Sequence, residues 1–124
     1  MTAPRILVVE DEFLIRMTLS EVLADEGFEV LEAGSAEEAL NVLNTTPPVA
    51  LLLTDVQLPG GTDGAALARQ ARARTATLPV VFMSGRPDTA PEPNTAARNY
   101  FIAKPYRLSD ICALVRRVVT ETAA

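Results

Sequence analysis

The stretch VALLLTDVQLPGG, residues 49–61, joins an apolar run to a carboxylate and a tight-turn signal. Apolar residues without alternation are typical of a strand buried on both faces, as in a parallel sheet. Asp55 follows this run after a single threonine. In open parallel sheets, ligands bind at the carboxyl ends of the strands. The stretch therefore predicts a strand over residues 49–53 that brings Asp55 to the functional edge of a sheet.

The rest of the chain alternates between short apolar runs and amphipathic segments. Further strands are predicted over residues 5–9, 28–33, 78–84 and 100–103. Ser35 and Asp63 are candidate N-caps of two helices, with Glu38 completing a capping box after Ser35. Apolar residues recur at helical spacing in four segments: Ile15, Leu19, Val22 and Leu23; Ala36, Ala39, Leu40 and Leu43; Leu67, Ala68 and Ala71; Ile111, Leu114, Val115 and Val118. This alternation predicts an α/β fold with a parallel sheet covered by helices on both faces.

One segment departs from this alternation. Three prolines, Pro87, Pro91 and Pro93, lie between the fourth and fifth predicted strands. Because proline disrupts helix interiors, only a short helix over residues 94–98 is expected there. Residues 86–94 are predicted to be irregular or mobile.

Composition excludes several classes of function. The length of 124 residues suits one domain, residues 1–124, and 48% hydrophobic residues argue against disorder. The chain has no histidine and one cysteine, Cys112, so histidine-based catalysis, an internal disulfide and an ordinary zinc site are excluded. A net charge of −5 disfavours nucleic-acid binding, and Arg69, Arg72 and Arg74 are interpreted as a solvated helix face. No signal peptide or membrane-length apolar run is evident, so no membrane association and a cytoplasmic location are expected.

Polar residues with complementary chemistry end four of the predicted strands. Glu10, Asp11 and Glu12 follow the first strand, Asp55 the third, Ser84 the fourth and Lys104 the fifth. Clustered carboxylates suit a hard cation such as Mg²⁺, with Asp11, Asp55 and the carbonyl of Gln57 as direct ligands and Glu10 acting through water. Asp55 would be a nucleophile, assisted by the Lys104 charge and the Ser84 hydroxyl. Each residue alone is also explained as a turn, cap or helix-entry residue.

Together, the motifs VVEDE, LLLTDVQLPGGTDG, VVFMSG and FIAKPY resemble the receiver domain of bacterial two-component response regulators, over about residues 4–119. The resemblance implies a flavodoxin-like (βα)5 three-layer fold with strand order 2-1-3-4-5. It implies that Asp55 is the phosphoacceptor, that Glu10 and Asp11 are the acidic pair, and that Lys104 is the conserved-type lysine. Ser84 and Phe101 take the positions of the two switch residues. The donor histidine is expected in a partner, a histidine kinase or histidine phosphotransfer protein. The chain itself is then a phosphoprotein with a possible downstream target, rather than an enzyme.

Two departures from the family pattern concern the surface. The segment PGGTDG is longer by one residue than the usual pattern. The proline-rich stretch stands where the fourth helix usually lies, so the usual dimer is not expected and a monomer or weak dimer is. This resembles stand-alone receivers without an output domain, although a piece of a hybrid kinase remains an alternative. Leu14 and Met17, expected near Pro105 and Tyr106, are either a docking patch for the donor or ordinary surface hydrophobes.

Three rival functions remain open. A phosphatase of the haloacid-dehalogenase type would need an acid where Gln57 stands, and a flavin carrier would need a phosphate loop where three acids stand. A degenerate receiver would serve only as an interaction module. The complete set of competent residue types favours a functional phosphoacceptor over this degenerate receiver.

Overall fold

The computed structural model of the protein describes residues 3–46, 48–85 and 98–123. The described residues form one sheet of five strands, each paired in parallel with its neighbours, in the order β2-β1-β3-β4-β5. The elements are β1 Arg5–Val9, α1 Phe13–Asp25, β2 Glu29–Ala33, α2 Ala36–Thr45, β3 Leu51–Asp55, α3 Gly64–Arg72, β4 Val80–Ser84, β5 Asn99–Ala103 and α4 Leu108–Ala123. The predicted flavodoxin-like fold and strand order are confirmed.

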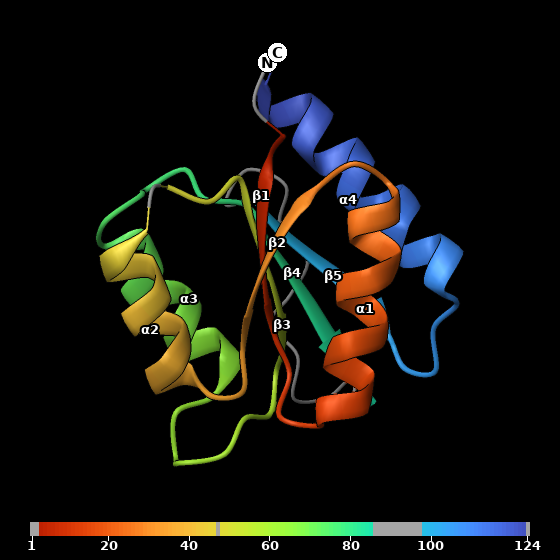
Figure 1. Ribbon diagram of the computed structural model, residues 1–124. Helices are drawn as coiled ribbons and strands as arrows, with labels where there is room; N and C mark the ends of the chain where they lie inside the picture. The colour runs from red at the N-terminus through yellow and green to blue at the C-terminus, as the bar shows by residue number, and fades with distance from the viewer. Residues whose placement is uncertain (1–2, 47, 86–97, 124) are drawn as a thin grey trace.

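Helices cover both faces of the sheet (Figure 1). Helices α2 and α3 pack on one face, and α1 and α4 on the other. Successive residues of a strand point to opposite faces, so Leu7 and Val9 enter the core beneath α2 and α3, whereas Ile6 and Val8 enter the core beneath α1 and α4. Burial on both sides explains why the central strands are continuously apolar.

The third strand differs from its prediction by two residues at each end. It begins at Leu51 and includes Thr54 and Asp55, all of them buried. Asp55 is therefore the last residue of the strand, and its backbone position is set by pairing with Met83 of β4. Ser84 likewise is the last residue of β4, paired with Ala103.

The predicted helix caps are present. The Ser35 side chain accepts a hydrogen bond from the Glu38 amide (3.2 Å), and Asp63 Oδ1 accepts one from the Ala66 amide (2.8 Å). The Glu38 carboxylate returns to the amide of Gly34 rather than to that of Ser35, so the capping box closes one residue earlier than the usual motif. These caps satisfy amides at the starts of α2 and α3 that have no partner within the helix.

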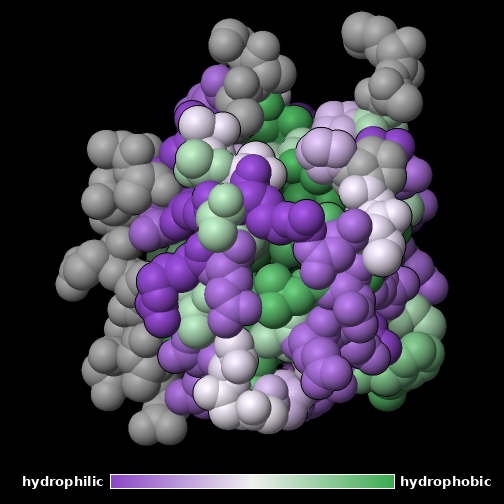
Figure 2. Space-filling view, turned by 90° about the vertical axis from the view of Figure 1, so that its left-hand side faces the viewer, coloured by the Kyte–Doolittle hydropathy of each residue, from purple (hydrophilic) through white to green (hydrophobic). Residues whose placement is uncertain are grey.

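The interpretation of the three arginines as a solvated helix face is wrong for Arg72. Its guanidinium donates to the carbonyls of Leu78 (3.0 Å) and Arg98 (3.0 Å) and to Asn99 Oδ1 (2.7 Å). Arg72 therefore ties the end of α3 to the starts of β4 and β5, whereas Arg69 and Arg74 are exposed. Figure 2 shows the outer face of the α2–α3 layer, where hydrophilic side chains cover most of the surface and hydrophobic atoms are visible between them.

Two expectations concern other parts of the chain. Residues 86–94 and nearly all of the short helix predicted over 94–98 lie outside the described residues. In the part of the chain that is described, no helix has the length and apolar character needed to cross a membrane.

Candidate functional site

Four strands deliver the predicted site residues to one edge of the sheet. Glu10 directly follows β1, Asp55 ends β3, Ser84 ends β4 and Lys104 directly follows β5. The Lys104 amide donates to the Ser84 carbonyl (2.8 Å), which extends the pairing of β4 and β5 to the site itself. Parallel pairing in register therefore brings together residues that are up to 94 positions apart, the difference between 104 and 10.

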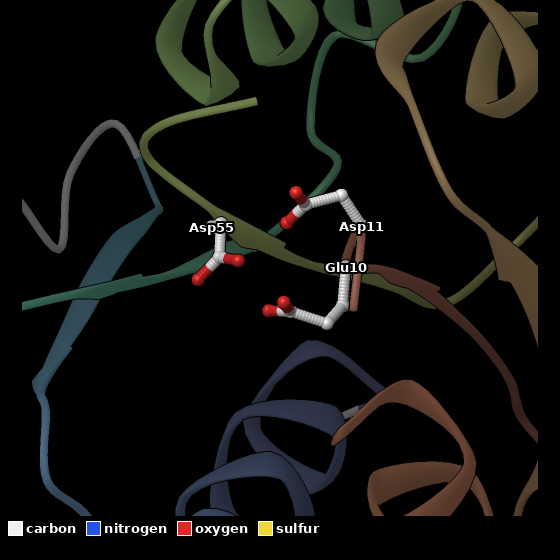
Figure 3. Close-up of side chains that lie close together, drawn as sticks. All are labelled: Glu10, Asp11 and Asp55. Carbon is white, nitrogen blue, oxygen red and sulfur yellow. The ribbon is translucent and has the colours of Figure 1, made fainter. Parts of the chain in front are cut away.

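Three carboxylates gather at this edge (Figure 3). Glu10, Asp11 and Asp55 each present an oxygen, and these oxygens all lie within 4.8 Å of one another. Glu10 and Asp55 are buried, at 1% and 4% exposure, whereas Asp11 is exposed. Three acids this close repel one another unless a cation or a proton lies between them.

Lys104 supplies one positive charge to the acids. Its Nζ lies 2.5 Å from Asp55 Oδ1 and 3.9 Å from Glu10 Oε2. Burial would lower the pKa of Lys104, but its hydrogen bond with Asp55 and the charges of Asp55 and Glu10 raise that pKa above its usual value. Lys104 is consequently a permanent cation against the Asp55 carboxylate.

Glu10 is the acid that its surroundings perturb most clearly. Burial, followed by the hydrogen bond and the charge of Asp55, raises the pKa of Glu10 to about 8, although the Glu12 amide and Lys104 act in the opposite direction. Its Oε2 is buried and has no hydrogen-bond partner among the residues that the structure describes. A buried carboxylate oxygen without a donor suits a cation or a cation-bound water.

A cavity of about 360 Å³ opens above these acids. Gln57 and Ser84 line it, as do Pro59 and Gly85, so all of the predicted phosphorylation and metal residues border one space. Phe101 is half-buried and packs against the core beneath α2 and α3. It therefore lies on the opposite face of β5 from Tyr100, which packs in the core beneath α1 and α4.

The structure adds two residues that sequence patterns did not single out. The buried Thr54 hydroxyl donates to the Asp55 carbonyl (2.9 Å). A Cβ at Gly64 would lie 2.1 Å from the same carbonyl oxygen, and the Gly64 amide donates to the Val56 carbonyl (2.7 Å). The start of α3 therefore lies directly against the backbone of β3 at Asp55. The Asp-Gly pair of the motif was visible in the sequence, but the contact it serves was not.

An apolar groove lies next to the acidic site. Leu14 lines it together with Tyr106 and Leu108, and the groove has a volume of about 290 Å³. Leu14 is 68% exposed and Met17 is 36% exposed. The expected closeness of Leu14 to Tyr106 is confirmed, whereas Met17 lies outside the lining of the groove.

A 2-1-3-4-5 parallel sheet with an acidic cluster and a lysine at its carboxyl edge defines a receiver-type protein. The family profile described as the response regulator receiver domain matches residues 6–116, and the chain belongs to this family. Membership supports a phosphoacceptor function in a two-component system, because receiver domains are phosphorylated and bind Mg²⁺.

Curated proteins similar to the chain include transcriptional regulatory proteins that are longer than it. It is 32% identical over 118 residues to the transcriptional regulatory protein PdtaR of Mycobacterium tuberculosis, covering 94% of this chain and 57% of that protein. It is 42% identical over 89 residues to the transcriptional regulatory protein AruR of Pseudomonas aeruginosa, covering 68% of this chain and 36% of that protein. The chain thus spans less than two thirds of the length of these curated relatives.

Among solved structures, the chain resembles the receiver domain of the hybrid histidine kinase CckA, with 34% identity and a TM-score of 0.79 over 93% of this chain and 98% of that one. A CheY-like receiver from Methanospirillum hungatei superposes with a TM-score of 0.85 over 98% of both chains. At 23% identity, the second similarity supports the fold alone.

Proposed function

We propose that the protein accepts a phosphoryl group on Asp55 from a phosphohistidine of a histidine kinase or histidine phosphotransfer protein. One observation carries this proposal: the buried Asp55 carboxylate lies beside both the Lys104 ammonium and the oxygens of Glu10 and Asp11. This arrangement places a nucleophile, a fixed positive charge and a cation-binding cluster around one cavity.

The donor set fits Mg²⁺. All candidate ligands are oxygens, and Glu10 Oε2, which is buried, lacks a hydrogen bond and lies 3.9 Å from Lys104 Nζ, suits a cation-associated role. Asp11, Asp55 and the carbonyl of Gln57 would hold the ion directly, and Glu10 would act through a water. The bound ion would neutralise charge on the phosphoryl oxygens during transfer.

The residues of the chain would then perform the transfer as follows. A carboxylate oxygen of Asp55 attacks the phosphorus of the donor, forming an O–P bond. The N–P bond of the phosphohistidine breaks, and its electron pair goes to the imidazole nitrogen. The donor ring leaves as neutral imidazole, with a proton already on its other nitrogen or one taken from solvent. Lys104 faces the group through its ammonium and would stabilise the negative charge of the phosphoryl oxygens.

Phosphorylation would change the surface beyond the cavity. The aspartyl phosphate adds charge and acceptor oxygens toward which the Ser84 hydroxyl can turn. Phe101, on the neighbouring strand β5, would rotate further into the core, which would alter the surface of residues 84–106 for a downstream target. The expected NMR signature is a change in the shifts of Phe101 after phosphorylation. Unchanged shifts would contradict the relay.

The donor would dock on the groove of Leu14, Tyr106 and Leu108. This surface is apolar, and its residues Leu14 and Tyr106 come two positions after Glu12 and Lys104, which line the cavity, so a helix bound there would lie near Asp55. The chain itself would not be an enzyme acting on small phosphate esters, because Gln57 cannot transfer protons in the position that such phosphatases give to an acid.

Intact-mass analysis tests the proposal directly. Wild type treated with acetyl phosphate and Mg²⁺ should gain one phosphoryl group, and Asp55→Ala should gain none. An unlabelled wild type would favour a degenerate receiver that serves only as an interaction module. Repeated hydrolysis of small phosphate esters would favour the phosphatase instead.

A further inference from the structure

Arg16 of α1 makes more contacts than is usual for an arginine at the protein surface. Its Nη1 donates to the Glu10 carbonyl (2.8 Å), and its Nε donates to Glu32 Oε1 of β2 (3.2 Å). Its guanidinium also lies 5.5 Å from the centroid of the Phe13 ring, and its side chain is only 18% exposed. A planar group restrained by three partners has one orientation, because a guanidinium presents its donors in a rigid fork.

The carbonyl that Arg16 holds belongs to the peptide bond that joins Glu10 to Asp11. A peptide unit is planar, so its carbonyl, amide and both Cα atoms share one plane. The direction of the Glu10 carbonyl therefore sets the position of the Asp11 Cα. The Glu10 amide donates to the Ala33 carbonyl of β2 (3.1 Å), so the sheet holds Glu10 on its amide side. Strand β1 ends at Val9, and Arg16 holds the carbonyl side, where the loop toward α1 begins.

The neighbouring backbone leaves room for this guanidinium. A Cβ at Gly34 would lie 3.2 Å from Arg16 Nη1 and 3.2 Å from Glu38 Oε2, closer than ordinary contact. The absence of a side chain at Gly34 therefore allows Arg16 to reach the Glu10 carbonyl while Glu38 binds the Gly34 amide.

A second ion pair between β1 and β2 provides a comparison. Arg5 Nε lies 2.7 Å from Glu29 Oε2 at the amino ends of these strands, far along β1 from the acidic site. The Arg5 and Glu29 side chains are 27% and 48% exposed, similar to 18% and 43% for Arg16 and Glu32. Exposed pairs of this kind contribute little stability on their own. The distinguishing feature of Arg16 is its bond to the backbone of the acidic pair.

We propose that Arg16 is a positioning residue that fixes the Glu10–Asp11 peptide and thereby increases the affinity of the acidic site for a divalent cation. The inference rests on the proposed function, because it assigns Mg²⁺ to that site. The inference also predicts the direction in which Mg²⁺ affinity changes when Arg16 is removed. Acting only as a nearby positive charge, Arg16 would weaken cation binding, so removing it would tighten binding. Acting through position, it strengthens binding, so removing it weakens binding.

The test is calorimetric titration of the unphosphorylated protein with Mg²⁺ alone, at constant ionic strength. Arg16→Gln should weaken Mg²⁺ binding by about tenfold, the lower end of losses seen when residues supporting metal ligands are removed. Arg16→Lys keeps the positive charge but loses the planar guanidinium with its several donors, so the affinity of this variant for Mg²⁺ should also fall. Arg5→Gln, the matched control, should bind as wild type does. Thermal unfolding of each variant checks that the fold is intact.

Glu32→Gln provides an independent variant, because its side chain is exposed on the edge strand and its loss spares the core. It should weaken Mg²⁺ binding less than Arg16→Gln does, partly through looser orientation of Arg16 and partly through loss of a negative charge. Unchanged or tighter binding by Arg16→Gln would overturn the inference whatever Glu32→Gln does, while labelling of Asp55 in wild type would leave the proposed function standing. A wild type that neither binds Mg²⁺ nor accepts a phosphoryl group would overturn both.

Discussion

Gly64→Ala tests the close approach between the start of α3 and the backbone of β3 at Asp55. The added Cβ would lie 2.1 Å from the Asp55 carbonyl oxygen, against about 3.3 Å for a normal carbon–oxygen contact, so the two backbones must separate by roughly 1 Å. Both neighbouring atoms, Asp55 C and Val56 Cα, are also backbone, at 3.1 Å, and no flexible side chain can move aside.

The magnitude follows from this geometry. Overpacking of this kind costs about 3 kcal/mol, and the reduced entropy of the unfolded chain offsets about 1 kcal/mol when glycine becomes alanine. The net loss of about 2 kcal/mol, divided by an unfolding entropy of about 0.26 kcal/mol/K for a chain of this length, lowers the Tm by about 8 °C. Because Asp55 moves with the strand, labelling by acetyl phosphate should slow by about 100-fold.

Gly85→Ala is the matched control for the Tm alone, because Gly85 lines the cavity at Asp55, and wild type is the reference for labelling. A Cβ there would lie 3.8 Å from Lys104 Cβ, an ordinary contact, so the Tm of this variant should stay within about 2 °C of wild type. The assays are calorimetric unfolding and the rate of mass gain with acetyl phosphate. If Gly64→Ala matched Gly85→Ala in Tm and matched wild type in labelling rate, the argument from close backbone approach would be refuted.

Three further predictions concern protonation, docking and capping. Since the pKa of Glu10 is raised from 4.5 to about 8, the folded metal-free protein holds a proton that the unfolded chain releases. Its free energy of unfolding should therefore fall, relative to Glu10→Gln, as pH rises from about 4.5 to about 8, and a pH-independent difference in thermal melts would contradict this. Charged substitutions at Leu14 and Met17 should slow phosphotransfer from a donor protein but not labelling by acetyl phosphate, and equal slowing in both assays would count against docking. Asp63→Ala should lower the free energy of unfolding by about 1 kcal/mol through loss of the cap on α3, whereas Asp63→Asn should retain most of it, as denaturant titration can show.

Local patterns in the sequence were sufficient for the elements of the fold. The unbroken apolar run before Asp55 identified a strand buried on both faces, and Ser35 and Asp63 marked the starts of two helices. These features depend on neighbours in the chain, namely on which side chains follow one another and which amides need a cap. The order of the strands followed from the resemblance of the motifs to a known family, and the structure confirms it.

The predicted site residues also converge as expected, because parallel strands end at one edge of the sheet. Only the tertiary structure decided which contacts fix the backbone at that edge of the sheet. The Arg72 side chain was interpreted as solvated, yet it donates to carbonyls of two residues that precede β4 and β5, and Arg16 donates to the Glu10 carbonyl. Gly64 lies against the Asp55 backbone. In such contacts, a side chain donates to the backbone of a distant segment, or a glycine without a side chain allows that backbone to come close. They leave no periodic signal in the sequence, because any carbonyl can accept a hydrogen bond whatever residue carries it.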